Sequence, residues 1–252
     1  PAQSFPVLLM DPRMISSFDP DSCRRQFPAL DREVDGQPAV FFDGPAGSQV
    51  PRGVIDAVGD YLAGSNANHG GSFLTSRASD AMLAEAHRAA ADFMGSADAE
   101  LVVFGANMTT LTFALSRALA KTWRAGDEVI VTRSAHDANF TPWVLAAADA
   151  GATVRYVDIR AGDCSLDLKG LAARLCERTR LVAVACASNF SGTIHPVEKI
   201  AALAHEVGAQ VFLDAVHYAP HAPLPVVQWD VHFLVFSALR SFRPPGVLLR
   251  GA

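Results

Sequence analysis

The feature of this sequence that most constrains its fold is a regular alternation of short apolar runs and helical segments from Ser48 onward. Short apolar runs bounded by turn residues are typical of strands that are covered on both faces of a sheet. The expected strands are Leu101–Phe104, Glu128–Thr132, Ala152–Ile159, Leu181–Ala187, Gln210–Asp214 and Val231–Phe236. Because helical segments separate most of these strands, the sequence predicts an α/β fold with a mostly parallel sheet flanked by helices.

Helix signals are found between the expected strands. The segment Pro51–Ala63 has a proline near its first turn and Gly64 after its end, and a second, alanine-rich segment is Ala78–Met94. Further helices are expected over Met108–Lys121, Pro142–Ala150, Leu166–Glu177 and Pro196–Val207. Residues 1–40, with many prolines and scattered charges, are expected to form an N-terminal arm, and residues 41–252 one large domain.

The composition argues against several classes of protein. With 50% hydrophobic residues and a net charge of -5, the chain is expected to be globular and not to bind nucleic acid. Neither a signal peptide nor a membrane span is expected, because the N-terminus lacks a basic start and no apolar stretch is long enough. The cysteines show no CxxC pair, which favours the reducing cytoplasm, and Cys186 is expected in the core.

Polar residues follow most of the expected strands. The carboxyl ends of parallel strands meet along one edge of a sheet, and ligands bind at that edge. The polar clusters at these ends are Asn107 with Met108 and Thr109, His136, Asn189, Asp214 with His217, and Ser237 with Arg240. We therefore expect these side chains to line a single ligand site.

Three of these clusters each have a functional and a structural interpretation. The turn Gly105–Thr110 opens a helix whose free N–H groups, with the Thr109 hydroxyl, suit a phosphate, or else Asn107 merely caps that helix. His136 suits stacking on a planar aromatic cofactor, or is a hydrogen-bonded loop histidine. Asn189 belongs to the same site, or only occupies a turn. No GxGxxG or GxxxxGK[ST] motif is present, which argues against a dinucleotide or P-loop site.

Asp214 is the most informative of the candidates. A carboxylate at the end of an apolar strand is costly to bury unless a positive group pairs with it, and a protonated pyridine nitrogen is such a partner. The alternative is that Asp214 caps the following turn. His217 and His221 are spaced like metal ligands on a helix, but Pro220 between them breaks such a helix, so no metal site is expected.

Taken in order along the chain, these residues resemble the class V aminotransferase family, in particular the cysteine desulfurase-like proteins. The resemblance runs from about Phe41 to Gly251. It is carried by the segments Phe42–Ser48, Asn66–Gly71, Ala135–Asn139, Ser188–Thr193 and Asp214–His221. It implies the three-layer α/β/α large domain of the pyridoxal phosphate (PLP)-dependent transferase fold, with PLP as the cofactor.

The resemblance also assigns roles to the residues at the strand ends. The backbone around Met108 and Thr109, together with Ser237, would hold the PLP phosphate. Around the ring, His136 would stack and take part in catalysis, Asn189 would contact the phenolic oxygen side, Asp214 would pair with the nitrogen, and His217 would lie close by. The family further implies a homodimer, with the cofactor near the subunit interface, and an amino-acid substrate. Its cysteine desulfurase members remove sulfur from cysteine.

The sequence departs from the family at the position of the Schiff-base lysine, which here holds Arg240. A guanidinium stays protonated and cannot form the covalent bond that a lysine forms with PLP, so the cofactor would be held non-covalently. The three lysines of the chain, Lys121, Lys169 and Lys199, lie in expected helices away from this strand end.

The sequence also stops soon after Arg240, whereas the family continues into a small C-terminal domain. That part of the family supplies an arginine for the substrate carboxylate and, in desulfurases, the catalytic cysteine. Residues 41–252 are therefore expected to be an incomplete PLP-binding large domain of a C-terminally truncated chain. The function expected is that of a cysteine desulfurase-like protein acting on amino acids, impaired or inactive because of Arg240. The alternative is a non-catalytic PLP-fold protein that binds the cofactor or dimerises, a pseudoenzyme.

Overall fold

The computed structural model describes residues 19–42, 44, 47–237 and 246–250. Its centre is a seven-stranded sheet with the strand order β3-β9-β8-β7-β6-β4-β5. The strands are β3 (Val102–Gly105), β4 (Glu128–Thr132), β5 (Thr153–Val157), β6 (Thr179–Ala185), β7 (Gln210–Asp214), β8 (Phe233–Ser237) and β9 (Gly246–Arg250). All pairs from β8 to β5 are parallel, and β9 is antiparallel to both of its neighbours. The mostly parallel sheet expected from the sequence is confirmed.

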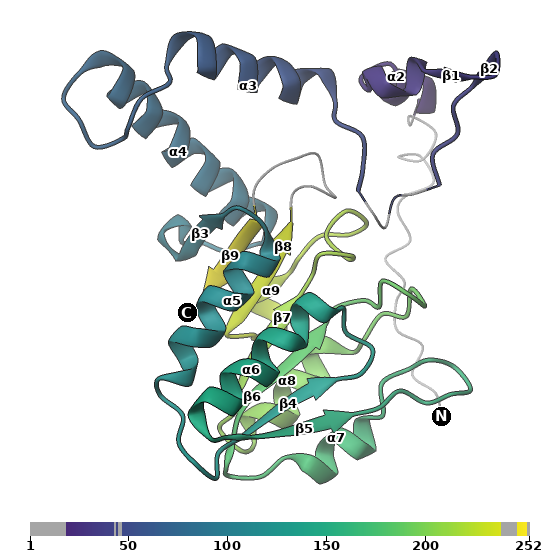
Figure 1. The fold of residues 1–252 in the computed structure, drawn as a ribbon, viewed down its shortest axis with the longest axis vertical. Coiled ribbons are helices and arrows are strands. Elements are labelled where there is room, and N and C mark those ends of the chain that lie inside the picture. Colours follow the sequence, from purple (N-terminus) through teal and green to yellow (C-terminus); the bar gives the residue numbers. More distant parts are fainter. Residues whose placement is uncertain (1–18, 43, 45–46, 238–245, 251–252) are drawn as a thin grey trace.

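Helices cover both faces of the sheet and complete the expected three layers (Figure 1). One face is covered by α5 (Met108–Ala120) and α6 (Thr141–Ala150). The other face is covered by α7 (Leu168–Arg174), α8 (Val197–His205) and α9 (Val226–Trp229). The α/β/α prediction is therefore confirmed.

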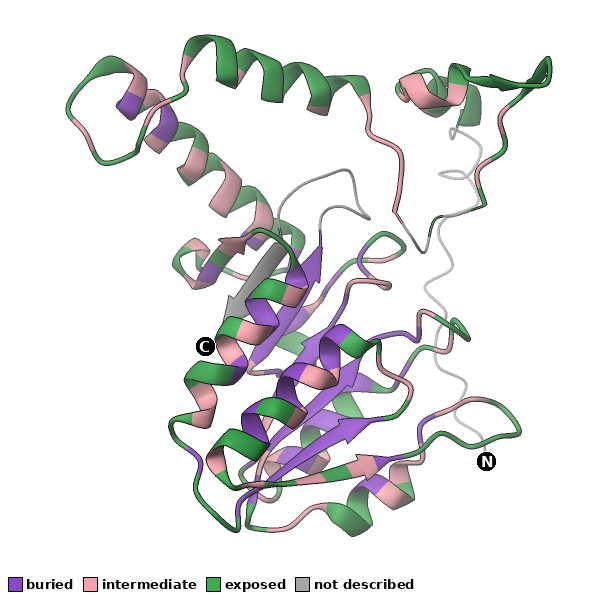
Figure 2. Ribbon diagram, in the orientation of Figure 1, coloured by how far each residue is buried: buried purple, intermediate pink, exposed green. Residues whose placement is uncertain are grey.

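The central strands supply side chains to a separate core on each face. Val129 and Val131 of β4 and Phe212 of β7 belong to the core under α5 and α6, where the ring of Phe212 lies 4.8 Å from that of Trp143. Ile130, between the two valines, belongs to the opposite core. Successive side chains of a strand point to opposite faces, so a strand buried on both sides needs an apolar residue at every position. Figure 2 shows these strands as the buried centre of the molecule.

Strand β9 is the main feature of the sheet that the sequence pattern does not predict. It lies between β3 and β8, with Leu249 paired to Val102 on one side and to Leu234 on the other. One short strand thus pairs with one side of β8 and of β3, and β3 becomes an edge strand of the sheet. The local pattern of a sequence does not encode which distant strand a short segment pairs with, so this insertion could not be foreseen.

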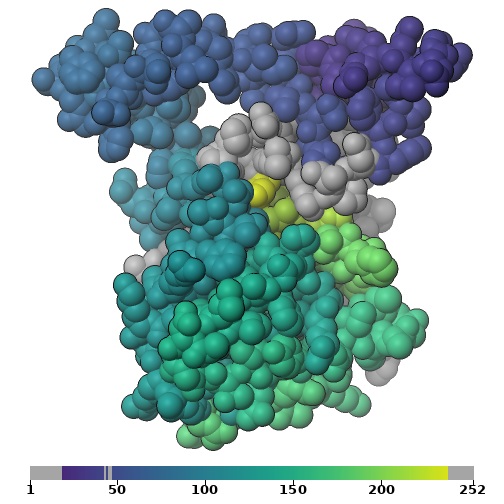
Figure 3. All heavy atoms as spheres, viewed as in Figure 1, coloured from purple at the N-terminus to yellow at the C-terminus, as the bar shows by residue number. Residues whose placement is uncertain are grey.

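A helical extension stands away from the sheet (Figures 1 and 3). It consists of α3 (Arg52–Gly64) and α4 (Leu74–Phe93). Helix α3 buries no residue, and α4 begins at Leu74 rather than at Ala78 as expected. The residues of α4 that are buried are Ser76, Ser79 and Ala91.

The segment before this extension contains only short elements. They are α2 (Pro20–Arg24), η1 (Pro28–Asp31), β1 (Glu33–Val34) and β2 (Gln37–Pro38). The division into an arm over 1–40 and a large domain over 41–252 stays a prediction. Within the described part of the chain, no helix combines the length and apolar character needed to span a membrane.

Candidate functional site

The polar clusters that follow the strands meet around one pocket with a volume of about 180 Å³. It lies where strands β6, β7 and β8 end and helix α5 begins. The predicted site residues that line it are Met108, Thr109, His136, Asn189, Asp214, His217 and Ser237. The lining residues not singled out as ligand contacts are Asn107, Ala138, Ala185, Ala187 and Val216. Arg240, the remaining predicted site residue, lies outside the described residues, and the roles of all eight stay predictions.

The start of α5 is held by the neighbouring residue Asn107 and by Ser237 at the end of β8. The Asn107 side chain accepts hydrogen bonds from the Thr110 N–H at 2.9 Å and from the Thr110 hydroxyl at 3.1 Å, so its capping role is confirmed. The Met108 N–H donates to the Ser237 hydroxyl at the end of β8, at 3.2 Å. A Cβ at Gly105 would lie 2.6 Å from the Leu111 side chain, so a larger residue here would force Leu111 to move. The helix N-terminus therefore opens onto the pocket, where its N–H groups suit an anion.

Asp214 brings a negative charge to the pocket from the end of β7. Its side chain is only 6% exposed, and Oδ1 accepts a hydrogen bond from the Val216 N–H at 2.9 Å. The residue thus both caps the following turn and lines the pocket, so its two interpretations are compatible. Cys186, which is fully buried as expected, has its pKa raised to about 12, first by burial and second by the charge of Asp214.

His136 is held by its own loop. It precedes the short helix η4 (Asp137–Asn139), and its Nδ1 accepts a hydrogen bond from the Ala138 N–H at 3.1 Å. The loop is anchored by Asn139, whose side-chain oxygen accepts a hydrogen bond from the Trp143 indole at 2.8 Å. His136 is therefore a hydrogen-bonded loop histidine that also lines the pocket.

Asn189 lies at the start of a tight loop after β6. The Ser188 hydroxyl accepts hydrogen bonds from the N–H groups of Phe190 and Ser191, each at 3.3 Å. Gly192 has a φ of 71°, a conformation that side chains disfavour, and its N–H donates to the Ser188 carbonyl at 2.9 Å. The loop therefore holds Asn189 at the pocket with little freedom.

His217 lies on the turn that follows Asp214. Its ring centroid is 5.6 Å from that of His221, with the two planes at 64°. The described residues contain no group of three or more His, Cys, Asp or Glu side chains arranged to hold a metal ion.

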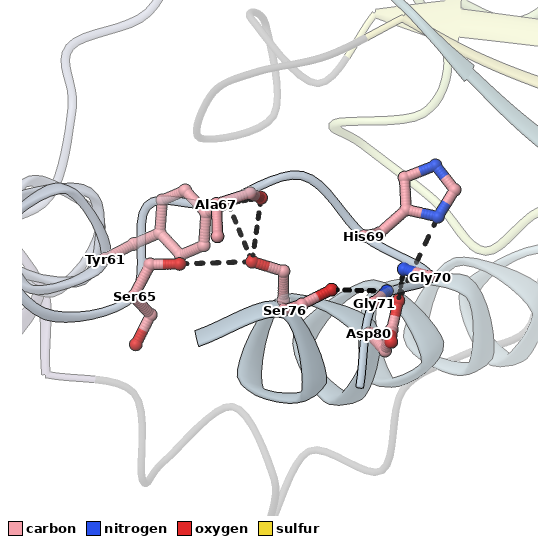
Figure 4. Close-up of polar contacts among 9 residues, drawn as sticks. Tyr61, Ser65, Ala67, His69, Gly70, Gly71, Ser76 and Asp80 are labelled. Carbon is pink, nitrogen blue, oxygen red and sulfur yellow. Dashed lines mark hydrogen bonds and ion pairs between the residues drawn. The ribbon is translucent and has the colours of Figure 1, made fainter. Parts of the chain in front are cut away.

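The segment Asn66–Gly71, which carries part of the family resemblance, does not line this pocket. It forms the loop between α3 and α4, and α4 fixes it through several polar contacts (Figure 4). The Ser76 hydroxyl accepts from the Gly71 N–H at 2.7 Å, and Asp80 accepts from the Gly70 N–H at 2.9 Å. The Ser79 hydroxyl lies 3.1 Å from the carbonyl oxygens of Ser65 and Ala67. The loop is therefore well defined although it lies at the end of the helical extension.

No lysine occurs among the described residues that line the pocket. Lys121 follows the last residue of α5, at the end of that helix opposite the pocket, and Lys169 and Lys199 lie in α7 and α8. Within the described chain, the site therefore offers a buried carboxylate, two imidazoles and a helix N-terminus. A small dipolar ligand fits this arrangement, with a proton-bearing ring nitrogen facing Asp214 and an anionic group facing α5.

Comparison with known proteins places this arrangement in one family. The sequence model of the family described as Aminotransferase class-V matches residues 40–249. A probable cysteine desulfurase from Synechocystis sp. is 36% identical over 231 residues, which cover 89% of this chain and 54% of the relative. A cysteine desulfurase from Shigella sonnei is 34% identical over 238 residues, covering 92% of this chain and 57% of the relative. The chain thus spans about half the length of the curated relatives it matches.

Solved structures show the same likeness in three dimensions. A cysteine desulfurase from Escherichia coli superposes with a TM-score of 0.82 at 27% identity, over 93% of this chain and 58% of the other. The apo cysteine desulfurase from Thermococcus onnurineus gives a TM-score of 0.83 at 28% identity, over 92% of this chain and 56% of the other. The fold of the described residues is therefore that of the cysteine desulfurases.

Proposed function

This chain belongs to the class V aminotransferase family, and from that premise we propose that it binds PLP without a covalent bond and acts on an amino acid as a cysteine desulfurase-like protein. PLP is the cofactor expected of the family. The observation that carries the proposal is the meeting of five strand-end clusters in one pocket that contains a buried carboxylate.

The residues of the pocket fit the chemical groups of PLP. Asp214 would hold the ring nitrogen in its protonated form, because a buried carboxylate is stabilised by a positive partner. The N-terminus of α5, with Thr109 and Ser237, would hold the phosphate. His136, which follows β4, and Asn189, which follows β6, would orient the ring. When bound, PLP supplies an electron sink for bonds at the α-carbon of an amino acid.

Arg240 sets the limit on activity in this proposal. A guanidinium keeps its proton at working pH, so Arg240 contributes charge toward an anionic cofactor but no covalent attachment and little proton transfer. We therefore propose that turnover is low. The second candidate is a non-catalytic PLP-binding or dimerising protein, which the absence of lysine among the described pocket residues favours.

The proposal includes a homodimer, as in the family that the sequence resembles. Helix α3 supports it, because Ile55, Val58 and Leu62 lie on one face of the helix and are 44%, 48% and 60% exposed. A second copy of the chain would cover this face. The cytoplasmic location expected from the cysteines stays a prediction.

The experiment that tests the proposal is a titration of the purified chain with PLP, followed by absorbance, then borohydride reduction and intact mass. The parent chain and the Arg240→Lys variant are compared. We expect saturable binding by both, and a reduced covalent adduct in the variant alone. An adduct in the parent would show that another amine bonds the cofactor, and no saturable binding by either chain would overturn the proposal.

A further inference from the structure

The pocket contains three titratable side chains among its described lining residues: His136, Asp214 and His217. In the proposed function Asp214 stays charged opposite the ring nitrogen. Chemistry at the α-carbon of an amino acid needs a group that takes up and returns a proton, and imidazole titrates in the right range for that task. The choice therefore lies between the two histidines.

The hydrogen bond that His136 accepts determines which of its ring nitrogens carries the proton. A neutral imidazole carries one proton, on either Nδ1 or Nε2. Nδ1 of His136 accepts the Ala138 N–H at 3.1 Å, so this nitrogen presents its lone pair to the backbone and the proton resides on Nε2. Neutral His136 consequently has no second lone pair with which to accept a proton from a substrate.

His217 lies on a turn with a fixed backbone. The N–H groups of Tyr218 and Ala219 both donate to the Ala215 carbonyl, at 3.1 and 2.8 Å, and the His221 N–H donates to the Tyr218 carbonyl at 2.9 Å. His217 is partly buried in the pocket wall, whereas His221 is exposed. The His217 ring in the pocket wall is thus in edge contact with the exposed imidazole of His221.

We propose that His217 is the residue that accepts and returns the α-proton of the amino-acid substrate, with His221 connecting it to solvent; this rests on the proposed function. In the forward step the Cα–H bond breaks, its proton bonds to the imidazole of His217, and its electron pair stays on the carbon. In the reverse step a proton returns from the imidazolium to the carbon. Nothing is oxidised or reduced, and exchange with His221 replaces the substrate proton by one from solvent.

The test is deuterium incorporation at the α-carbon of L-alanine in D₂O, with the PLP-loaded chain. We expect the parent to exceed the rate given by PLP alone. His217→Gln should lower the excess by about 100-fold or more, the range found for removed acid–base groups, and His221→Gln should lower it less. His87→Gln is the matched control, because His87 contacts Ala99 and Phe104 and does not line the pocket.

Chemical rescue distinguishes proton transfer from a structural role. A His217→Gly variant should regain exchange when free imidazole is added, whereas the parent and the His87→Gln variant should not respond. Loss of exchange without rescue would assign His217 a structural role and overturn the inference, as would unchanged exchange in His217→Gln.

Two measurements separate this inference from the proposed function. The loss of PLP affinity in the His217→Gln variant should be much smaller than its loss of exchange, since a polar side chain is retained at the pocket wall. In the chain without PLP, nitrogen NMR should show neutral His136 protonated on Nε2. A parent that binds PLP but gives no exchange above free PLP overturns the inference alone, and a parent that does not bind PLP overturns both.

Discussion

Asp214 is the residue on which the cofactor assignment depends most directly. Its carboxylate is buried beside the pocket, and its charge adds to the effect of burial in raising the pKa of the Cys186 thiol. In Asp214→Asn the side chain keeps its shape and loses its charge. We expect PLP affinity to fall by about 10- to 100-fold, because a hydrogen bond to a charged group contributes about 1.5–3 kcal/mol. Titration by absorbance measures this change.

The matched control for Asp214→Asn is Asp163→Asn. Asp163 is an exposed carboxylate that pairs with Arg160 at the surface and does not line the pocket. Its replacement should leave PLP affinity unchanged. Equal affinities of the two variants would remove Asp214 from the cofactor site.

The sequence predicted which of the described residues line the pocket, but not how their side chains are hydrogen-bonded. Met108, Asn189, Asp214 and Ser237 line the pocket because the ends of parallel strands meet at one edge, a rule that needs only the strand assignments. The proton position on His136 depends on a backbone N–H two residues later, a geometry that no residue pattern specifies.

At the scale of single elements, the first turn of helix α5 is expected to affect both the stability of the fold and the binding of PLP. Asn107→Ala removes the side chain that caps the helix, which should lower the free energy of unfolding by about 1 kcal/mol. The same change leaves the first turn less ordered where a phosphate would bind, so PLP affinity should fall as well. Urea denaturation and PLP titration measure the two effects.

The control for the cap is Asp98→Ala. Asp98 caps the short helix η3 (Ala99–Leu101) through the Glu100 N–H and does not line the pocket. This variant should lose stability and keep its PLP affinity. A parallel loss of affinity would mean that Asn107 affects binding only through general stability.

An ion-pair network around the buried carboxylate of Glu128 joins β4 to β5 and to the residue before β6, at the ends of the strands opposite the pocket. Glu128 of β4 accepts two hydrogen bonds from Arg155 of β5, both at 3.0 Å, and one from Arg178, just before β6, at 2.8 Å. These contacts, the bonds to Arg155 foremost, lower the pKa of Glu128 from 4.5 to about 2, against the opposing effect of burial. The carboxylate is thus ionised in the folded chain at any pH near neutral.

Glu128→Gln should lower the free energy of unfolding by about 1 kcal/mol at neutral pH, because it leaves two partly exposed guanidinium groups without their anion. The folded pKa is below the unfolded one, so this contribution is fully present above pH 4.5 and is lost as pH falls toward 2. The difference between parent and variant should shrink over that interval. The control is Glu198→Gln, because the exposed Glu198 accepts its hydrogen bond from the neutral side chain of Gln228. Its replacement should change the free energy of unfolding little at any pH.

The elements themselves were predictable to different degrees. Strands β4 and β7 begin and end at the expected residues, since each is an apolar run of three residues between two polar ones. Helix α4 starts earlier than its alanine-rich segment, because Ser76 is turned inward to bond the preceding loop rather than interrupting the helix. Strand β9 was missed because its pairing depends on residues far away in the sequence.

For the whole molecule, the exposed face of α3 leads to a prediction about assembly. Ile55→Glu with Leu62→Glu should convert a dimer into a monomer of 26.8 kDa, because charges at both positions would have to be buried in the interface. Light scattering coupled to gel filtration measures the mass. Val227→Glu, at an isolated exposed position 73% accessible, is the control and should keep the parent mass. A parent that is already monomeric would contradict the proposal.

The position of β9 also has a consequence for folding. Within the described sheet β3 pairs only with β9, and this pairing joins Val102 to Leu249. During synthesis, β3 therefore leaves the ribosome long before its partner exists. Contacts between residues so far apart in the sequence slow folding, so the nascent chain exposes an unpaired strand until β9 has emerged. In that interval the unpaired edge of β3 exposes the nascent chain to aggregation.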